Sequence, residues 1–236
     1  MVSVHALSFD VWNTLLDINK IFNLISIKIA ELSNGLSSAM VMSTILNVYE
    51  KCKTRRRLGE VDGFNIVIES QNILAEELGL EISTILKAIA EAFEEANPRE
   101  IIFSDAITTL ELLHRLGFRL GIIGNTVFWS SIYTINLLKR LGIYNLFEVT
   151  IFSDETRINK PDRRIFLMFS KNIGLEPSKI AHVGDSVIED VGGALSAGMK
   201  AIHIDRRRGK NKVILRDIGL ALIGELTQVI DALEEL

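Results

Sequence analysis

The spacing of apolar residues divides this chain into a helical segment and an alternating one. Between residues 18 and 97, apolar side chains recur every three or four positions, which is the period of an amphipathic helix. Turn-forming residues interrupt the pattern at Asn34-Gly35, at residues 59–63, at Gly79 and at Pro98. The segment therefore predicts four helices joined by short turns and packed as a small bundle.

The rest of the chain alternates between short apolar runs and helical patterns. Helices are expected over residues 106–116, 130–141, 163–173, 188–197 and 226–236, and strands over residues 4–9, 118–123, 147–152, 180–183 and 200–204. This alternation favours βα units, so the fold class is α/β with a doubly wound parallel sheet. We expect one core domain, residues 1–17 and 98–236, interrupted by a helical domain inserted over residues 18–97.

Asp10 stands at the carboxyl end of the first predicted strand. Ligands of open parallel sheets bind outside the carboxyl ends of the strands. A carboxylate at that place can act as a nucleophile and form a covalent aspartyl intermediate, which divides one difficult substitution into two easier ones. The alternative is an aspartate that only caps the following turn.

Three later segments favour the nucleophile over the turn cap. Residues 120–126 form a second apolar strand that ends in small and hydroxyl residues. Lys160 precedes Pro161 in a loop, and a third strand ends in Asp185 with Asp190 five residues later. In chain order, the four segments supply a nucleophile, an anion cradle, a fixed cation and a two-carboxylate metal site.

With these segments in place, the chain resembles the haloacid dehalogenase-like (HAD) hydrolase superfamily. The resemblance covers nearly the whole chain, and residues 9–16, 159–166 and 183–197 carry it. A helical insertion directly after the first motif is similar to the subgroup whose helical cap lies at that position. The resemblance implies a HAD-like Rossmannoid core beneath an α-helical cap domain.

The resemblance also implies roles for individual side chains. One oxygen of Asp10 attacks the substrate while the other binds Mg²⁺, and Lys160 neutralises both the nucleophile and the substrate anion. Asp185 is a direct metal ligand, and Asp190 is a second acid that holds Lys160 or a metal-bound water. Mg²⁺ prefers one or two carboxylates together with waters and substrate oxygens, which agrees with this set.

Position 12 departs from the phosphatases of the family, which usually carry there an aspartate that acts as general acid and base. This chain has Trp12, whose indole cannot exchange protons at useful pH. Loss of a general acid or base typically costs ~10²–10⁴ in rate. In the family this position binds the metal through its backbone carbonyl, so Trp12 stays a predicted metal contact, and its ring could line the substrate pocket. Asn13 replaces the usual glycine and tolerates a left-handed backbone.

The anion cradle departs from the family pattern as well. The family usually has serine or threonine where this chain has Gly124, which keeps a backbone N–H but lacks the hydroxyl. Asn125 and Thr126 could compensate, because both can donate to an anion. Thr14 fits the second small position of the first motif and can donate in the same way, or it could cap a helix. We therefore expect substrate contacts from Thr14, Gly124, Asn125 and Thr126, together with Trp12.

Composition and charge narrow the classes further. The 236 residues are 48% hydrophobic and 24% charged with a net charge of −4, which is typical of a globular protein and gives no general attraction to nucleic acid. The single cysteine, Cys52, excludes an intrachain disulfide and fits a reducing compartment. We find no membrane-spanning stretch and no signal-peptide pattern, so we expect a cytoplasmic monomer or homodimer without a membrane partner.

Two arginine runs and four histidines have not yet been assigned a role. Residues 55–57 lie in the predicted cap, where they either hold a substrate anion in the active site or form a solvated helix face. Residues 206–208 are interpreted as a surface loop. The histidines have no ligand-like spacing, and we assign none of them to a metal.

Three functions compete for this set of residues. The first is a Mg²⁺-dependent phosphohydrolase that acts on a small phosphorylated metabolite, which Asp185 and Asp190 favour. The second is a metal-independent 2-haloacid dehalogenase, because its halide leaves without a proton and its family members carry an aromatic residue at the position of Trp12. Those dehalogenases, however, usually have Ser and Asn in place of Gly184-Asp185.

The third function is a non-catalytic regulatory or binding protein. Retention of Asp10, Lys160, Asp185 and Asp190 argues against it. The sequence therefore favours the phosphohydrolase, with the dehalogenase as the alternative and a small anionic molecule as the substrate of either.

Overall fold

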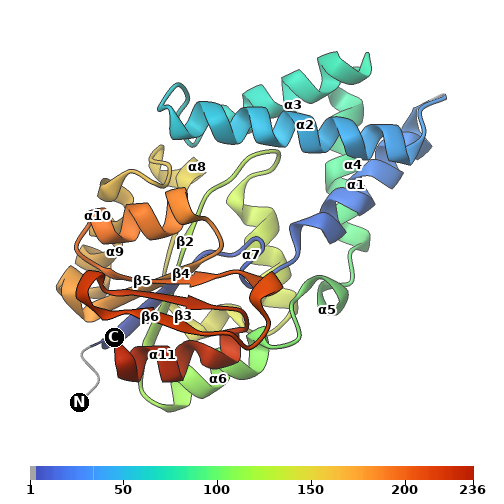
Figure 1. Ribbon diagram of the computed structural model, residues 1–236. Coiled ribbons are helices and arrows are strands. Elements are labelled where there is room, and N and C mark those ends of the chain that lie inside the picture. Colours follow the sequence, from blue (N-terminus) through green and yellow to red (C-terminus); the bar gives the residue numbers. More distant parts are fainter. Residues whose placement is uncertain (1–3, 34) are drawn as a thin grey trace.

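The computed structural model describes residues 4–33 and 35–236 and has an α/β fold (Figure 1). Over these residues one seven-stranded sheet has the order β3-β2-β1-β4-β5-β7-β6. Its strands are β1 (Ala6–Phe9), β2 (Arg119–Gly124), β3 (Phe147–Phe152), β4 (Ile180–Gly184), β5 (Lys200–Ile204), β6 (Val213–Leu215) and β7 (Leu220–Ile223). All neighbouring strands are parallel except β6, which pairs antiparallel with β7. The predicted fold class is confirmed.

Helices cover both faces of the sheet, as a doubly wound fold requires. Figure 1 shows α6 (Ala106–Arg115) and α11 (Val229–Glu235) on one face, and α9 (Arg163–Ile173) and α10 (Gly193–Ser196) on the other. The remaining core helices are α5 (Pro98–Ile101), α7 (Ser131–Arg140), α8 (Ser153–Thr156), a π-helical turn (Val187–Gly192) and the 3₁₀ turns Tyr144–Leu146, Pro177–Lys179, Arg206–Arg208, Arg216–Ile218 and Leu226–Gln228. The two faces bury separate apolar clusters, because successive residues of β1 point to opposite sides.

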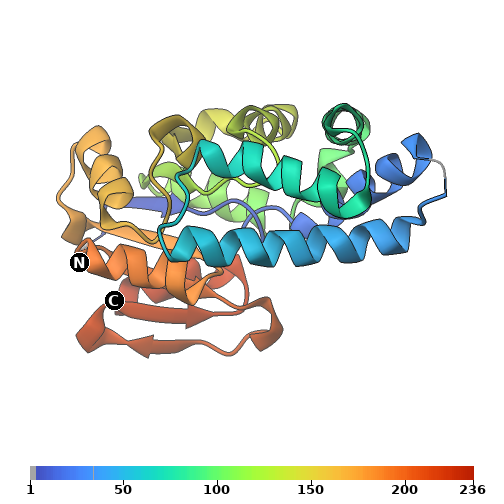
Figure 2. The same ribbon diagram turned by 90° about the horizontal axis from the view of Figure 1, so that it is seen from above.

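The helical insertion between β1 and β2 contains the four predicted helices. They are α1 (Ile18–Leu32), α2 (Ser38–Arg57), α3 (Asn65–Leu78) and α4 (Ile82–Glu95). Local signals set their ends: the Ser37 side chain accepts from the backbone N–H of Met40 at the start of α2, and Gly79 ends α3 in a left-handed conformation. Figure 2 shows the long α2 crossing the molecule, so that its C-terminal end lies beside the core.

Several element boundaries agree with the sequence prediction, and others differ for physical reasons. Strands 147–152 and 200–204 and helix 163–173 have the predicted bounds. Strands β6 and β7 were not predicted, because β6 is only three residues long and lies at the sheet edge. The helices predicted over 188–197 and 226–236 begin instead as a π-helical and a 3₁₀ turn. A short helix, α5, was not predicted and follows the helical insertion directly.

Two further predictions concern the undescribed residues and membrane-spanning helices. The predicted turn residue Asn34 and the first three residues of the core lie outside the described residues. In the part of the chain that is described, no helix is long and apolar enough to cross a membrane.

Candidate active site

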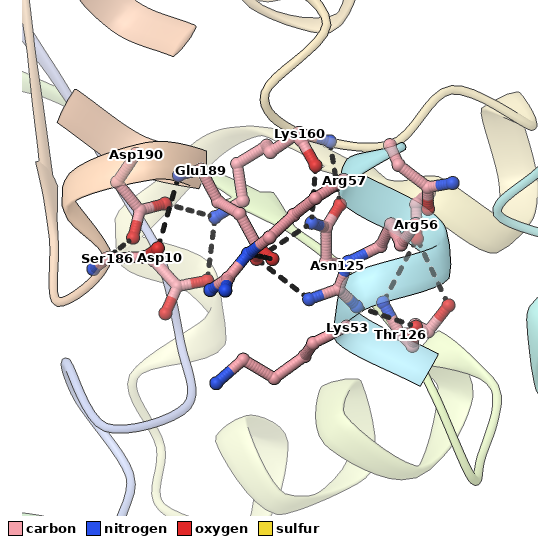
Figure 3. Close-up of polar contacts among 12 residues, drawn as sticks. Asp10, Lys53, Arg56, Arg57, Asn125, Thr126, Lys160, Ser186, Glu189 and Asp190 are labelled. Carbon is pink, nitrogen blue, oxygen red and sulfur yellow. Dashed lines mark hydrogen bonds and ion pairs between the residues drawn. The ribbon is translucent and has the colours of Figure 1, made fainter. Parts of the chain in front are cut away.

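Asp10, Lys160 and Asp190 form a buried charged chain at the carboxyl edge of the sheet (Figure 3). The backbone N–H of Asp10 donates to the carbonyl of Val183 at 2.9 Å, which fixes the end of β1 beside β4. The Lys160 ammonium donates to Oδ1 of Asp10 at 2.7 Å and to Oδ1 of Asp190 at 2.6 Å. Lys160 is only 1% exposed, so both contacts are made away from water.

Asp190 is held by further donors from β4 and from the turn after it. The Ser186 N–H donates to its Oδ2 at 2.9 Å, and Nε2 of His182 lies 3.1 Å from its Oδ1. The other ring nitrogen of His182 contacts Ser8 Oγ at 2.8 Å. A Cβ on Gly184 would lie 2.2 Å from Cγ of Asp190, so only glycine leaves room for this carboxylate. These contacts make Asp190 a fixed partner of Lys160.

The charges in this site are not balanced by the protein alone. Carboxylate oxygens of Asp10, Asp185 and Asp190 lie within 4.8 Å of one another, and Lys160 is the cation that contacts two of these acids. Burial, opposed by Lys160 and reinforced by Asp190, raises the pKa of Asp10 to about 6. Burial and the charges of Asp10 and Asp190 raise the pKa of Asp185 well above its usual value. A divalent cation would relieve both effects.

The pKa of Asp190 shifts in the opposite direction, because both Lys160 and His182 contact this carboxylate. Burial would raise the pKa of Asp190, but Lys160 and His182 outweigh burial and hold it well below its usual range. The same ion pairs raise the pKa of Lys160 despite its burial. Both oxygens of Asp190 accept close hydrogen bonds from the protein, whereas Oδ2 of Asp10 accepts only a long one from Thr14, so Asp10 and Asp185 are the acids that fit a metal ion best.

The turn after β1 has the conformation that the first motif requires. Asn13 adopts a positive φ of 64°, as its place in the motif predicted. The Thr14 hydroxyl donates to Oδ2 of Asp10 at 3.3 Å, and the guanidinium of Arg206 donates to the Thr14 carbonyl at 2.7 Å. Arg206 also pairs with Asp105 at 3.1 Å. Residues 206–208 form a short turn with no buried residue, but the half-buried Arg206 side chain also anchors the motif from across the fold.

The predicted anion cradle, residues 124–126, lies between the loop that carries Lys160 and the helical insertion. The amide of Asn125 accepts from the Lys160 N–H at 2.9 Å and donates to the Lys160 carbonyl at 3.1 Å, so it fastens the loop that carries the lysine. The Thr126 hydroxyl lies 3.1 Å from Ser153 Oγ. A Cβ on Gly124 would lie 2.6 Å from the ring of Phe152, which explains why this position has no hydroxyl side chain. All three residues lie at the same edge as Asp10.

Trp12 belongs to an aromatic wall between the core and the cap. Its ring packs edge-on against Phe93 and Trp129, and its Nε1 donates to the Thr134 hydroxyl at 3.3 Å. Phe22, Tyr49 and Phe128 continue the wall. The wall lines one side of a cavity of about 40 Å³ that Asp10 and Asp185 also line.

The cap and the core are joined beside this cavity by a buried ion-pair cluster. Arg56 and Arg57, at the end of α2, donate to the two oxygens of Glu189 at 2.7 and 2.9 Å. The Asn125 amide donates to the same carboxylate at 3.3 Å. Arg56 and Glu189 are 5% and 6% exposed. The arginine run therefore reaches the site with these two members, whereas Arg55 pairs with Glu69 within the cap.

Sequence reasoning missed three residues of this arrangement. Glu189 and His182 are buried polar partners whose positions follow no motif that we used, and Arg206 acts over a long sequence separation. A charged residue directly before Asp190 was the available signal for Glu189. Cys52 is buried in the hydrophobic core, and burial raises the pKa of its thiol.

Comparisons with known proteins agree with this geometry. A model of haloacid dehalogenase-like hydrolases matches residues 4–198. The glyceraldehyde 3-phosphate phosphatase of Methanopyrus kandleri is 34% identical over 46% of this chain and 44% of its own length. (S)-2-haloacid dehalogenase 1 of Pseudomonas sp. (strain CBS-3) is 26% identical over 87% of this chain and 86% of its own.

The likeness extends to the fold as a whole. The structure of the HAD-hydrolase YfnB from Bacillus subtilis, solved bound to magnesium, aligns with a TM-score of 0.81 at 19% identity, over 98% of this chain and 99% of the other. The chain spans somewhat less than half the length of the curated phosphatases that it matches first.

Proposed function

Because the chain belongs to the haloacid dehalogenase-like hydrolases, we propose that it is a Mg²⁺-dependent phosphohydrolase that acts on a small phosphorylated metabolite. The observation that carries this proposal is the Asp10, Asp185 and Asp190 cluster, whose oxygens lie within 4.8 Å with one lysine beside them. The buried Asp10 and Asp190, the half-buried Asp185 and one ammonium leave a net charge of −2 when all are ionised, which a divalent cation would neutralise. The family's metal-independent dehalogenases usually lack the carboxylate at position 185.

In this proposal each side chain has one role. Asp10 and Asp185, with the backbone carbonyl of Trp12, would hold Mg²⁺, which supplies charge neutralisation for a phosphoryl group in the site. Asp10 attacks phosphorus and forms an aspartyl phosphate while the bond to the leaving oxygen breaks; water then hydrolyses the aspartyl phosphate and releases inorganic phosphate. Lys160 holds the attacking carboxylate ionised, and Asp190 positions Lys160.

Substrate contacts follow from the same edge of the sheet. We propose that Thr14 and the backbone N–H groups of residues 124–126 face the phosphoryl oxygens. Residues 18–97 form the cap domain and residues 1–17 with 98–236 the core, and motion of the cap admits substrate and excludes water. The cavity supports this division, because residues of the helical insertion and of the core line it together, so motion of the insertion would widen it.

Proton transfer distinguishes this enzyme from an ordinary phosphatase. Trp12 stands where the family has its general acid, and its indole N–H already donates to Thr134. We propose that the enzyme prefers leaving groups that need no proton, such as acyl and aryl phosphates. For the same reason, hydrolysis of the aspartyl phosphate is slow, and the phosphoenzyme accumulates as a burst.

A second candidate, 2-haloacid dehalogenase, is favoured by the same aromatic wall. A halide leaves without a proton, so a site with Trp12 and without a nearby general acid suits it. (S)-2-haloacid dehalogenase 1 of Pseudomonas sp. aligns over 87% of this chain, which also supports this candidate.

A hydrolysis screen distinguishes the two functions. Acyl phosphates, aryl phosphates, alkyl phosphates and 2-halo acids are each assayed with Mg²⁺ and with EDTA. The phosphohydrolase is expected to turn over acyl and aryl phosphates only with Mg²⁺, whereas the dehalogenase is indifferent to EDTA. Asp10→Asn should abolish either activity, and retained activity in this variant would remove Asp10 as the nucleophile.

A further inference from the structure

Arg56 is buried at the boundary between cap and core, and its hydrogen bonding is incomplete. Its Nη2 donates to Glu189 at 2.7 Å, and its Nη1 reaches the Thr126 carbonyl at 3.4 Å. Its Nε is buried and has no hydrogen-bond partner within residues 4–33 and 35–236. A buried N–H without an acceptor is unfavourable, so this nitrogen has an unused capacity to donate.

The charges around Arg56 are also incomplete. The Glu189 carboxylate accepts from Arg56, Arg57 and the Asn125 amide, so one anion faces two guanidinium groups. Figure 3 shows the two arginines converging on Glu189 beside the Asp10 and Lys160 pair. Asp10 and Asp185 line the same cavity. Once a divalent cation neutralises these acids, two guanidinium groups that share one carboxylate leave a positive charge that favours the arrival of a further anion.

The geometry of the cavity sets the size of that anion. Arg56 lines the same cavity as Asp10 and Asp185, and that cavity holds about 40 Å³. A ligand that contacts both Asp10 and Arg56 must therefore be short, because each added carbon requires a larger displacement of the cap. A flat carboxylate needs less room than a second phosphate.

We propose that Arg56 forms an anion subsite that takes the carboxylate of a short substrate while the reacting group of that substrate lies at Asp10. This inference rests on the proposed function and names its substrate class, a phosphorylated or otherwise activated acid with one or two carbons between its reacting group and its carboxylate. Nε of Arg56 donates to the carboxylate, and Glu189 keeps the guanidinium in place through Nη2. Arg56 is thus a specificity-determining residue contributed by the cap.

Binding can be measured without turnover, because both tryptophans of the chain, Trp12 and Trp129, line the cavity. Tryptophan fluorescence is titrated in the presence of Mg²⁺ with phosphonoacetate, which carries a carboxylate, and with propylphosphonate, which does not. Arg56→Gln should weaken phosphonoacetate binding about tenfold or more, the usual effect of losing a charged hydrogen bond, and leave propylphosphonate binding nearly unchanged. Equal affinity of wild type and Arg56→Gln for phosphonoacetate would overturn the subsite.

Matched variants separate recognition from folding. Arg57→Gln also removes an ion pair with Glu189, but Arg57 does not line the cavity, so this variant should keep the preference for phosphonoacetate. Arg56→Lys keeps a positive charge and should restore part of the affinity. If Arg57→Gln loses the preference as fully as Arg56→Gln, the preference reflects cap packing and the subsite is refuted. Thermal unfolding of each variant confirms that the protein is folded during the titration.

A third ligand separates this inference from the proposed function. Propanoate has a carboxylate and no phosphorus. If neither phosphonate binds to the wild type, the phosphohydrolase proposal fails, yet propanoate binding that Arg56→Gln abolishes still supports the subsite. Propanoate that binds wild type and Arg56→Gln equally would refute the subsite whatever the phosphonates do.

Discussion

At the scale of single residues, Lys160 has the greatest effect on its surroundings. It is buried between two carboxylates, with a third acid, Asp185, close by. Removing one partner of a buried ion pair leaves uncompensated charge and costs about 3–5 kcal/mol. Lys160→Met should therefore lower the free energy of unfolding in urea by about that amount and abolish turnover.

Lys87→Met is the matched control for the loss of unfolding free energy in Lys160→Met. Lys87 pairs with Glu91 on the surface of α4, at 3.8 Å and with its side chain 61% exposed. Such a pair contributes about 0–1 kcal/mol, so Lys87→Met should leave unfolding and turnover nearly unchanged. If both variants unfold alike, Lys160 does not act as a buried counter-ion.

Trp12 offers the second test at this scale. Trp12→Asp restores a carboxylic acid at the position where phosphatases of the family carry one, so turnover of alkyl phosphates should rise toward the ~10²–10⁴ that a general acid–base contributes. Turnover of 2-halo acids should fall. The measurement is kcat/KM for an alkyl and an aryl phosphate.

Trp12→Phe controls for packing, because it keeps an aromatic ring beside Phe93 and Trp129. It should lose only the hydrogen bond to Thr134 and leave the substrate preference intact. An equal gain on alkyl phosphates in both variants would mean that cavity space, and not proton transfer, limits the rate.

At the scale of elements, the loop between α2 and α3 is pressed against α8. A Cβ on Gly63 would lie 2.1 Å from the Ser153 carbonyl oxygen, and the Gly63 N–H donates to the Arg157 carbonyl at 3.4 Å. Gly63→Ala should push this loop off the core, open the cap and cost about 1–3 kcal/mol of unfolding free energy. Small-angle X-ray scattering should show a larger radius of gyration.

Gly192→Ala is the matched control, because its added Cβ would meet the nearest atom, the Val187 carbonyl oxygen, at an ordinary 3.5 Å. Its radius of gyration should equal that of the wild type. An unchanged radius in Gly63→Ala would show that this contact does not hold the cap closed.

In the π-helical turn Val187–Gly192, charged residues are buried and apolar residues are exposed, the reverse of what hydrophobicity predicts. Val187 and Ile188 are 61% and 52% exposed, whereas Glu189 and Asp190 are 6% and 2% exposed. Hydrophobicity alone would place the apolar pair inside. The charged pair is buried because Lys160, Arg56 and Arg57 lie in front of it, and none of these cations is near in sequence.

At the scale of the whole molecule, a metal ion would couple the site to the stability of the fold. Asp10 follows β1 and Asp185 follows β4, far apart in the sequence, so an ion between them binds the native state and favours it by mass action. Mg²⁺ at about 100 times its Kd should add roughly 2.7 kcal/mol, seen as a higher melting temperature. Asp185→Asn should lose most of this gain, while a gain as large as that of the wild type would place the ion elsewhere.

The same experiment has a defined pH dependence. In the metal-free site the pKa of Asp10 is about 6 and that of Asp185 is well above its usual value, so at lower pH protons must leave both carboxyl groups before the ion binds. The stabilisation by Mg²⁺ should therefore be present at pH 8 and decline as the pH falls through about 6. The thermal shift at pH 5, 6, 7 and 8 measures it, and a shift independent of pH would exclude Asp10 as a ligand.

The sequence by itself determined most of the elements, apart from short ones such as β6 and α5, and the order of the motifs. The bounds of β3, β5 and α9 follow from the local period of apolar residues, because that period reports which face of an element is buried. The positions of Asp10 and Asp185 at strand ends follow too, since parallel strands share one carboxyl edge.

Only the tertiary structure decided which distant side chains complete the site. Arg56 meets Glu189 across 133 positions, and Arg206 meets the Thr14 carbonyl across 192. Such contacts leave no local periodicity, because each depends on how the cap and the two halves of the sheet pack together. For the same reason, the sequence could name Trp12 as an anomaly, but only packing showed that it belongs to an aromatic wall closing a small cavity.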